Sequence, residues 1–166
     1  MRPLDIAILL KIAVKGSEKW YMKDLAYELV ISASEISESI NRSVYAGLIS
    51  TNKKTINKLA LFDFINSGLR YAFPQKPGAI SRGIGTAHSA PPLNNHIISN
   101  EQFVWPYAKG EMRGLSIEPL YPKLPEACLK DRPFYEFMAL IDAIRAGKAR
   151  EHELAAKILK EKLEYA

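Results

Sequence analysis

The sequence has a single cysteine and no long apolar run. One cysteine, Cys128, excludes a disulfide within the chain and any cysteine-rich zinc site. The longest apolar stretch, Ile6–Leu10, is too short to span a bilayer. It is bordered by the charged residues Asp5 and Lys11, which do not fit the apolar region of a signal peptide. We therefore expect a globular protein of the reducing cytoplasm that has no contact with a membrane.

Acidic residues are nearly missing from one segment. Between Ser50 and Arg82 the sequence has six basic residues and one acidic residue, a local net charge of +5, whereas the rest of the chain sums to zero. A local basic excess is the electrostatic footprint expected for contact with phosphates. The other interpretation of the same charge is a solvated, lysine-rich surface.

Two short helical patterns separated by a turn lie between Met22 and Ile49. The inward-facing residues are Met22, Leu25, Ala26 and Leu29 in the first pattern, and Ile36, Ile40 and Val44 in the second. Val30–Ala33 is the predicted turn, and Ser34 is predicted to cap the second helix. Gly47 is expected to end that helix in the left-handed conformation.

Four short motifs of this stretch match a known pattern. They are Asp24-Leu25-Ala26 in the first helix, Ile31-Ser32 at the turn, Ser34-Glu35-Ile36 at the start of the second helix, and Ala46-Gly47-Leu48-Ile49 after it. Through these motifs, roughly residues 3–56 resemble the helix-turn-helix of winged-helix transcription regulators, broadly the MarR-like group. The resemblance implies that the second helix enters the DNA major groove and that a two-stranded wing follows.

The wing has two candidate positions. Ser50–Thr55 is short and polar, and helical spacing returns over Ile56–Ser67. We therefore expect either a very small wing or one displaced to a ribbon between Leu69–Phe73 and residues near Ile80–Thr86.

Polar side chains on the outer face of the predicted recognition helix are candidates for base contact. They are Ser34, Ser37, Glu38, Asn41 and Arg42. Asn pairs well with adenine and Arg with guanine, whereas a carboxylate can accept from the cytosine amino group. Because Glu35 and Glu38 give this helix a net charge of −1, phosphate contacts are assigned to nearby basic residues. These are Lys53, Lys54, Lys58, Arg70 and Arg82.

Broad apolar faces occur in helical patterns at both ends of the chain. Near the N-terminus the face comprises Ile6, Leu9, Leu10 and Ala13, widened by Ile8 and Ile12. A helical hairpin is predicted over 133–166, joined at Gly147, and its second helix has the stripe Ala155, Ile158, Leu159 and Leu163. We interpret the terminal stripe, or else the first helix, as a homodimer surface. A homodimer lets two recognition helices reach successive major grooves, about 34 Å apart.

The middle of the chain differs in composition. Nine of the ten prolines and five of the nine glycines lie between Pro74 and Pro133, so helix is not expected over most of this span. Short strands are predicted at Tyr71–Pro74, Phe103–Pro106 and Leu115–Tyr121. Its aromatic residues could line a ligand pocket, but core packing is favoured. They are Trp105, Tyr107, Tyr121, Phe134 and Tyr135.

No catalytic constellation emerges from the remaining polar residues. His88 and Ser89 are adjacent, which rarely permits a nucleophile–base hydrogen bond, and no third group orients them. The spacing of His88, His96 and His152 matches no metal motif. We therefore expect no enzymatic activity, no metal and no cofactor.

The sequence predicts an α+β fold that is mainly helical. Residues 1–73 form a winged-helix-like domain, 74–132 form extended segments with short strands, and 133–166 form the helical hairpin. The predicted function is sequence-specific binding of double-stranded DNA in transcription control, as a homodimer. The alternative is a protein-interaction module, antitoxin-like or accessory to another protein, that uses a degenerate winged helix.

Overall fold

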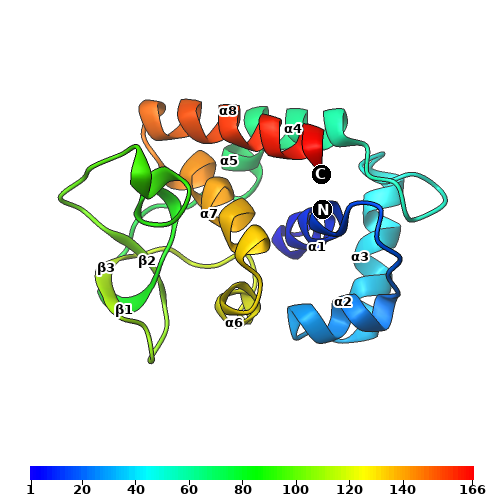
Figure 1. Cartoon of the computed structure of the whole chain (residues 1–166), viewed down its shortest axis with the longest axis horizontal. Helices are drawn as coiled ribbons and strands as arrows, with labels where there is room; N and C mark the ends of the chain where they lie inside the picture. The colour runs from blue at the N-terminus through cyan, green and yellow to red at the C-terminus, as the bar shows by residue number, and fades with distance from the viewer.

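Helices make up most of the computed structural model, which describes residues 1–166, and the fold is α+β and mainly helical as predicted (Figure 1). The helices are α1 (Pro3–Lys15), α2 (Met22–Leu29), α3 (Ala33–Tyr45), α4 (Lys58–Ser67), α5 (Leu69–Ala72), α6 (Leu124–Leu129), α7 (Arg132–Ala146) and α8 (Ala149–Tyr165). Two 3-10 turns, η1 (Ala87–Ser89) and η2 (Leu93–Asn95), and the strands β1 (Ile80–Gly85), β2 (Phe103–Pro106) and β3 (Met112–Ser116) complete the fold. No helix is both long enough and apolar enough to cross a membrane.

The first helix lies at the centre of the molecule. Every residue of α1 from Asp5 to Ala13 is buried, because α2 and α3 pack against it and α7 also contacts it (Figure 1). The face that Ile8 and Ile12 widen is therefore covered within the chain. This corrects the expectation that α1 offers a free surface for dimer formation.

Lys11 is a buried charge on α1 that joins three helices. Its Nζ atom lies 2.9 Å from Glu28 on α2 and donates to Asp131, the N-cap of α7. Burial opposes the charged form of Lys11, but hydrogen bonds to Asp131 and Glu28 outweigh it and raise its pKa. Asp131 also accepts from the Phe134 N–H at 3.1 Å, so one carboxylate both starts α7 and fixes it to α1.

The apolar stripe of α8 is also internal. α8 packs on α7, as the predicted hairpin requires, and on α4 (Figure 1). Ala155, Leu159 and Leu163 are buried, and Ile158 is partly buried. The stripe is not free for a partner chain, because α7 and α4 together cover it.

A single hydrophobic cluster extends through the whole chain. It includes Leu25 from residues 1–73, Trp105 from residues 74–132 and Leu159 from residues 133–166. The three sequence segments therefore share one core.

The three strands form a small closed sheet. β1 pairs antiparallel with both β2 and β3, and a short parallel contact beside Phe103 and Leu115 joins β2 to β3. The predicted ribbon between Leu69–Phe73 and β1 is wrong, because Leu69–Ala72 forms the short helix α5. The strand predicted at Phe103–Pro106 is confirmed.

A buried carboxylate on α7 holds the sheet in place. Asp142 Oδ2 accepts from Trp105 Nε1 at 2.6 Å and from Thr86 Oγ1 at 2.7 Å. Its Oδ1 accepts from Arg145 Nη2 at 3.0 Å. All four side chains are buried, so this network fixes β2 and the end of β1 against α7.

The internal position of the α8 stripe can be tested with Leu159. Leu159→Ala should lower the free energy of unfolding by about 2–5 kcal/mol, because a fully buried leucine leaves a cavity. Tyr165→Ala, an exposed control on the same helix, should change it by less than about 0.5 kcal/mol. Urea unfolding should be measured at two protein concentrations. The midpoint should depend on concentration to the same extent in the wild type and in Leu159→Ala, whereas loss of that dependence in the variant alone would assign the stripe to a dimer interface.

Candidate nucleic-acid interface

α2 and α3 are joined by a short turn at one end of the long axis of the molecule (Figure 1). The turn begins at Val30, which has a left-handed backbone (φ 59°, ψ 45°). This conformation is costly for a β-branched residue and is retained only where packing on both sides demands it. The predicted positions of both helices are confirmed, and Gly47 has the predicted left-handed backbone (φ 76°).

The N-cap of α3 is Ser32, not the predicted Ser34. Ser32 Oγ accepts from the Glu35 N–H at 3.2 Å, and the Glu35 carboxylate accepts from the Ser32 N–H at 3.1 Å. This reciprocal capping box is encoded by the Ser-x-x-Glu spacing. Ser34 therefore lies exposed in the first turn of α3, and Glu35 has a structural role.

Arg42 faces the interior, which corrects its assignment to base contact. Its Nε and Nη2 atoms donate to the two carboxylate oxygens of Asp5 at 3.0 and 2.7 Å. The Arg42 side chain is 26% exposed, and that of Asp5 is fully buried. Burial alone would raise the pKa of Asp5, but the Arg42 guanidinium and the Arg2 N–H outweigh it and hold that pKa below its ordinary value. The bidentate pair fixes the orientation of α3 on α1.

The remaining outer face of α3 is polar. Ser34, Glu38 and Asn41 are exposed, Ser37 is partly buried, and Tyr45 at the C-terminal end is 98% exposed. With Arg42 bound to Asp5, the fixed charges on this face are the carboxylates of Glu35 and Glu38.

A tight turn occupies the position of the expected wing. Ile49 and Ile56 form a single antiparallel bridge, and the Ser50 N–H donates to the Thr55 carbonyl at 2.8 Å. Asn52 Oδ1 accepts from the backbone N–H groups of residues 54 and 55, at 2.8 and 3.1 Å, which stabilises the tip. At this position the structure has one bridge and a turn instead of the expected two-stranded wing.

The two lysines of this turn lie beside α3 and the α1–α2 loop. Lys53 Nζ donates to Asn41 Oδ1 at 2.8 Å. Lys54 Nζ lies 3.7 Å from the ring centroid of Trp20 and donates to its carbonyl at 2.9 Å. Lys58 is directed elsewhere, because its ammonium donates to the carbonyl of Ala166.

Arg70 and Arg82 do not share a surface with α3. Arg70 is on α5 and Arg82 is on β1, and the sheet lies at the opposite end of the long axis from α3 (Figure 1). The basic excess of this segment is therefore divided between separate surfaces, because α4 leads the chain away from the turn.

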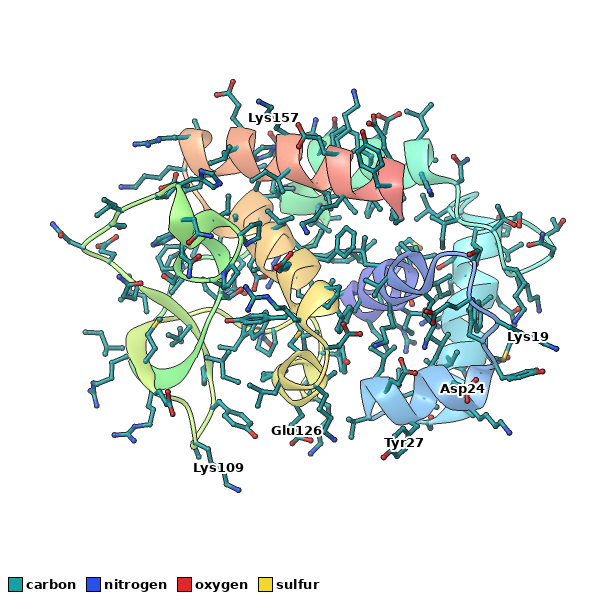
Figure 2. The ribbon with its side chains drawn as sticks, viewed as in Figure 1. Lys19, Asp24, Tyr27, Lys109, Glu126 and Lys157 are labelled. Atoms are coloured by element: carbon teal, nitrogen blue, oxygen red, sulfur yellow. The ribbon has the colours of Figure 1, made fainter.

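Two lysines that the sequence did not single out join this surface. The ammonium groups of Lys19 and Lys23 lie 5.4 and 5.8 Å from the ring centroid of Tyr21. Lys19 also shares a shallow cavity of about 420 Å³ with Lys54, and Figure 2 shows Lys19 at the α2 end of the molecule. We call Lys19, Lys23, Lys53 and Lys54 the lysine rim. None of its members forms an ion pair.

The other polar residues that the sequence singled out have structural partners. His88 is buried, with Nε2 2.6 Å from the Glu101 carbonyl, and Ser89 Oγ accepts from the Phe103 N–H at 2.9 Å. Cys128 is buried, and that burial raises the pKa of its thiol. No group of three His, Cys, Asp or Glu side chains could hold a metal ion.

Comparison with protein-family models, curated proteins and solved structures finds no match to this chain.

The Asp5–Arg42 pair gives a prediction for stability. Arg42→Ala should lower the free energy of unfolding by about 3 kcal/mol at pH 7, because it leaves the Asp5 carboxylate buried and unpaired. The folded-state pKa of Asp5 lies below its unfolded value of about 3.9, so the pair stabilises the protein above about pH 4. This contribution disappears as the pH falls through the folded-state pKa. Urea unfolding at pH 7 and pH 3 should show a smaller difference between the two proteins in acid. An equal difference at both values would contradict an ionised pair.

Proposed function

We propose that the protein binds double-stranded DNA through α3 and regulates transcription. The observation that carries this proposal is an exposed polar helix beside four lysines, from two separate segments, that form no ion pair. In this arrangement α3 enters the major groove, and the lysine rim contacts the phosphates beside it.

The shape and rigidity of α3 support this proposal. Its outer face presents small polar side chains, Ser34, Ser37 and Asn41, which let the helix approach base edges closely. The major groove is about 12 Å wide and admits one α-helix. The bidentate contact between Arg42 and Asp5 holds α3 in one orientation, as base readout requires.

The charges around α3 are mixed, and two of the carboxylates have structural roles. The four lysines of the rim lie near four carboxylates, those of Glu35 and Glu38 on α3 and those of Glu18 and Asp24 beside Lys19 and Lys23. Glu35 caps α3 and Asp24 caps α2, each by accepting a backbone N–H. Glu38 is exposed and can accept from a cytosine amino group.

The proposal includes a homodimer, since one short recognition helix provides modest affinity and symmetry doubles the contacts. The dimer must use a surface other than the face of α1 and the stripe of α8, because both are covered within the chain.

A protein-interaction module is the second candidate. Two tyrosines support it, because Tyr27 on α2 and Tyr45 on α3 are almost fully exposed. Exposed aromatic side chains are enriched at protein interfaces, and carboxylates on α3 disfavour DNA. Absence of binding to any DNA at low salt would favour this candidate.

The lysine rim predicts the salt dependence of DNA binding. A triple variant, Lys19→Ala, Lys23→Ala and Lys53→Ala, should weaken binding on all sequences alike. It should also flatten the slope of log K against log salt by up to about three units, because each lysine that meets a phosphate contributes about 0.9. Fluorescence anisotropy with a labelled duplex at several salt concentrations measures this slope.

A matched control has three exposed lysines outside the rim. Lys76→Ala, Lys148→Ala and Lys157→Ala should leave the slope unchanged, since none lies on α2, α3 or the turn. If the two triple variants behave alike, the rim does not contact phosphates.

Asn41 is expected to contribute to the base specificity of α3. Asn41→Ala should cost roughly 1–3 kcal/mol on a site selected from a random duplex pool, and much less on random DNA. Ser37→Ala is the companion variant, because Ser37 shares the face without contacting Lys53. Competition binding measures both. Equal losses of binding free energy on the two DNAs would mean that Asn41 contacts the phosphate backbone. If neither variant loses affinity, α3 does not bind in the major groove.

A further inference from the structure

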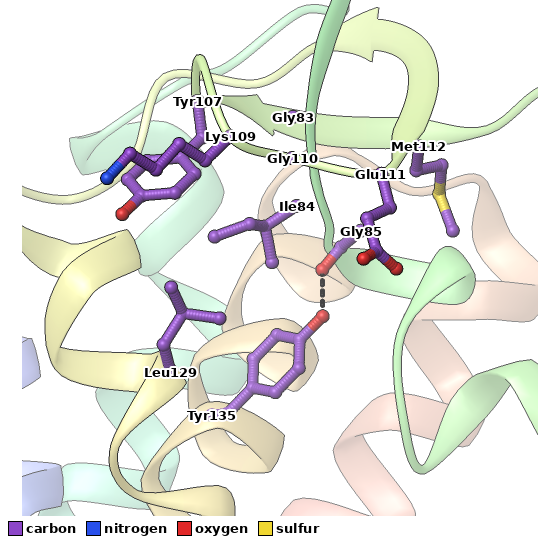
Figure 3. Close-up of a pocket in the computed structure, with 10 residues that line it drawn as sticks. All are labelled: Gly83, Ile84, Gly85, Tyr107, Lys109, Gly110, Glu111, Met112, Leu129 and Tyr135. Atoms are coloured by element: carbon purple, nitrogen blue, oxygen red, sulfur yellow. Dashed lines mark hydrogen bonds between the residues drawn. The ribbon is translucent and has the colours of Figure 1, made fainter.

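A cavity of about 630 Å³ lies between the small sheet and α6 and α7, at the end of the molecule away from α3 (Figure 3). Its apolar walls include Ile84 from β1, Leu129 from α6 and Tyr135 from α7. The volume falls within the range of about 300–1,000 Å³ that is usual for small-molecule sites. Leu129 faces this cavity with 58% of its surface exposed.

The wall formed by Tyr135 is held in place before any ligand arrives. Its hydroxyl donates to the Gly85 carbonyl, as Figure 3 shows. Burial raises the pKa of Tyr135 to about 12, so the hydroxyl stays protonated and keeps this role at neutral pH. Trp105 supports the ring from behind, with centroids 5.7 Å apart, and its own indole is fixed by Asp142. A rigid apolar wall of this kind lowers the ordering cost of binding.

Two opposite charges border the cavity. Lys109 and Glu111 are exposed and lie on the loop between β2 and β3. Neither forms an ion pair with the other or with any other residue. Figure 3 shows the ammonium and the carboxylate on opposite sides of Ile84.

The loop that carries these charges is fixed by a close backbone contact. A Cβ atom added to Gly110 would lie 2.2 Å from the Gly83 carbonyl oxygen, so only glycine allows this approach. The positions of Lys109 and Glu111 on either side of Gly110 are therefore set by the sheet.

We propose that this cavity binds a short zwitterionic peptide of about dipeptide length, a size compatible with the cavity volume. An apolar side chain of the peptide lies against Ile84, Leu129 and Tyr135. Its carboxylate faces Lys109 and its ammonium faces Glu111. A purely anionic ligand would be repelled by Glu111 and a purely cationic one by Lys109. The two charged ends of a dipeptide lie farther apart than those of a single amino acid, in keeping with charges on opposite sides of Ile84. The site is independent of DNA binding by α3.

The test uses the full chain and the dipeptide Leu-Leu in isothermal titration calorimetry. The expected dissociation constant is on the order of 0.1–1 mM, as the size of the ligand permits. Leu129→Ala should weaken binding about tenfold, because the variant loses an apolar contact. Leu59→Ala on α4 is the matched control, since Leu59 is 70% exposed and lies outside the cavity, and it should leave binding unchanged.

The charged contacts are tested by changing the ends of the peptide and the side chains of Lys109 and Glu111. Acetyl-Leu-Leu-amide, which has no charged ends, should bind roughly fivefold more weakly, because exposed ion pairs contribute little each. Lys109→Glu or Glu111→Lys alone should weaken Leu-Leu binding, and the two changes combined should restore it with the peptide reversed.

Three results would overturn the proposal. The first is no heat of binding up to about 10 mM Leu-Leu, a concentration beyond the affinity range expected for a ligand of this size. The second is equal affinity for Leu-Leu and the blocked peptide. The third is unchanged affinity for Leu-Leu in Leu129→Ala. Equal affinity for the blocked peptide would indicate an internal segment of a protein partner.

Discussion

The paired charges of a buried helix determine how the parts of this protein are arranged. α1 carries Asp5 and Lys11 into the core, where an unpaired charge would cost several kcal/mol. Asp5 can remain ionised only with Arg42 of α3 beside it, and Lys11 only with carboxylates from α2 and α7. These requirements leave one orientation for α3 relative to the rest of the chain. The surface helix α3 is held in place because the buried carboxylate of Asp5 must be paired with Arg42.

The proposed DNA surface and the cavity lie at opposite ends of the molecule and depend on the same kind of support. In both, a side chain that can meet a ligand depends on a buried residue: Asn41 projects from a helix that Arg42 anchors to buried Asp5, and Tyr135, which is partly buried, is backed by buried Trp105 and the Asp142 network. Function at either end would then rest on residues that never contact a ligand. Substitutions at Asp5 of α1 would be expected to disturb the α3 end, and substitutions at Asp142 of α7 the cavity.

Local patterns in the sequence were enough to predict α2, α3 and the terminal hairpin, because apolar spacing reports which face of a helix is buried. Such patterns do not reveal which element covers the buried face, and so the stripe of α8 was assigned to a partner chain although α7 and α4 cover it. Arg42 was assigned to the outer face because its partner, Asp5, lies 37 residues away in sequence. Lys19 and Lys23 of the lysine rim were missed for the same reason, since folding brings the α1–α2 loop beside a turn that follows α3. Ser32 could have been found, because its spacing from Glu35 is a capping signal.

The closure of the small sheet also affects how this protein meets other chains. β1 is hydrogen-bonded on both sides, and the short contact between β2 and β3 closes the remaining gap. Open sheet edges are the sites where extended chains add by backbone pairing, in aggregates as well as in peptide complexes. A proline- and glycine-rich segment with three short strands would otherwise carry that risk. Because this sheet offers no such edge, another chain that approaches it must be recognised through side chains and charges, and self-association by strand addition is disfavoured.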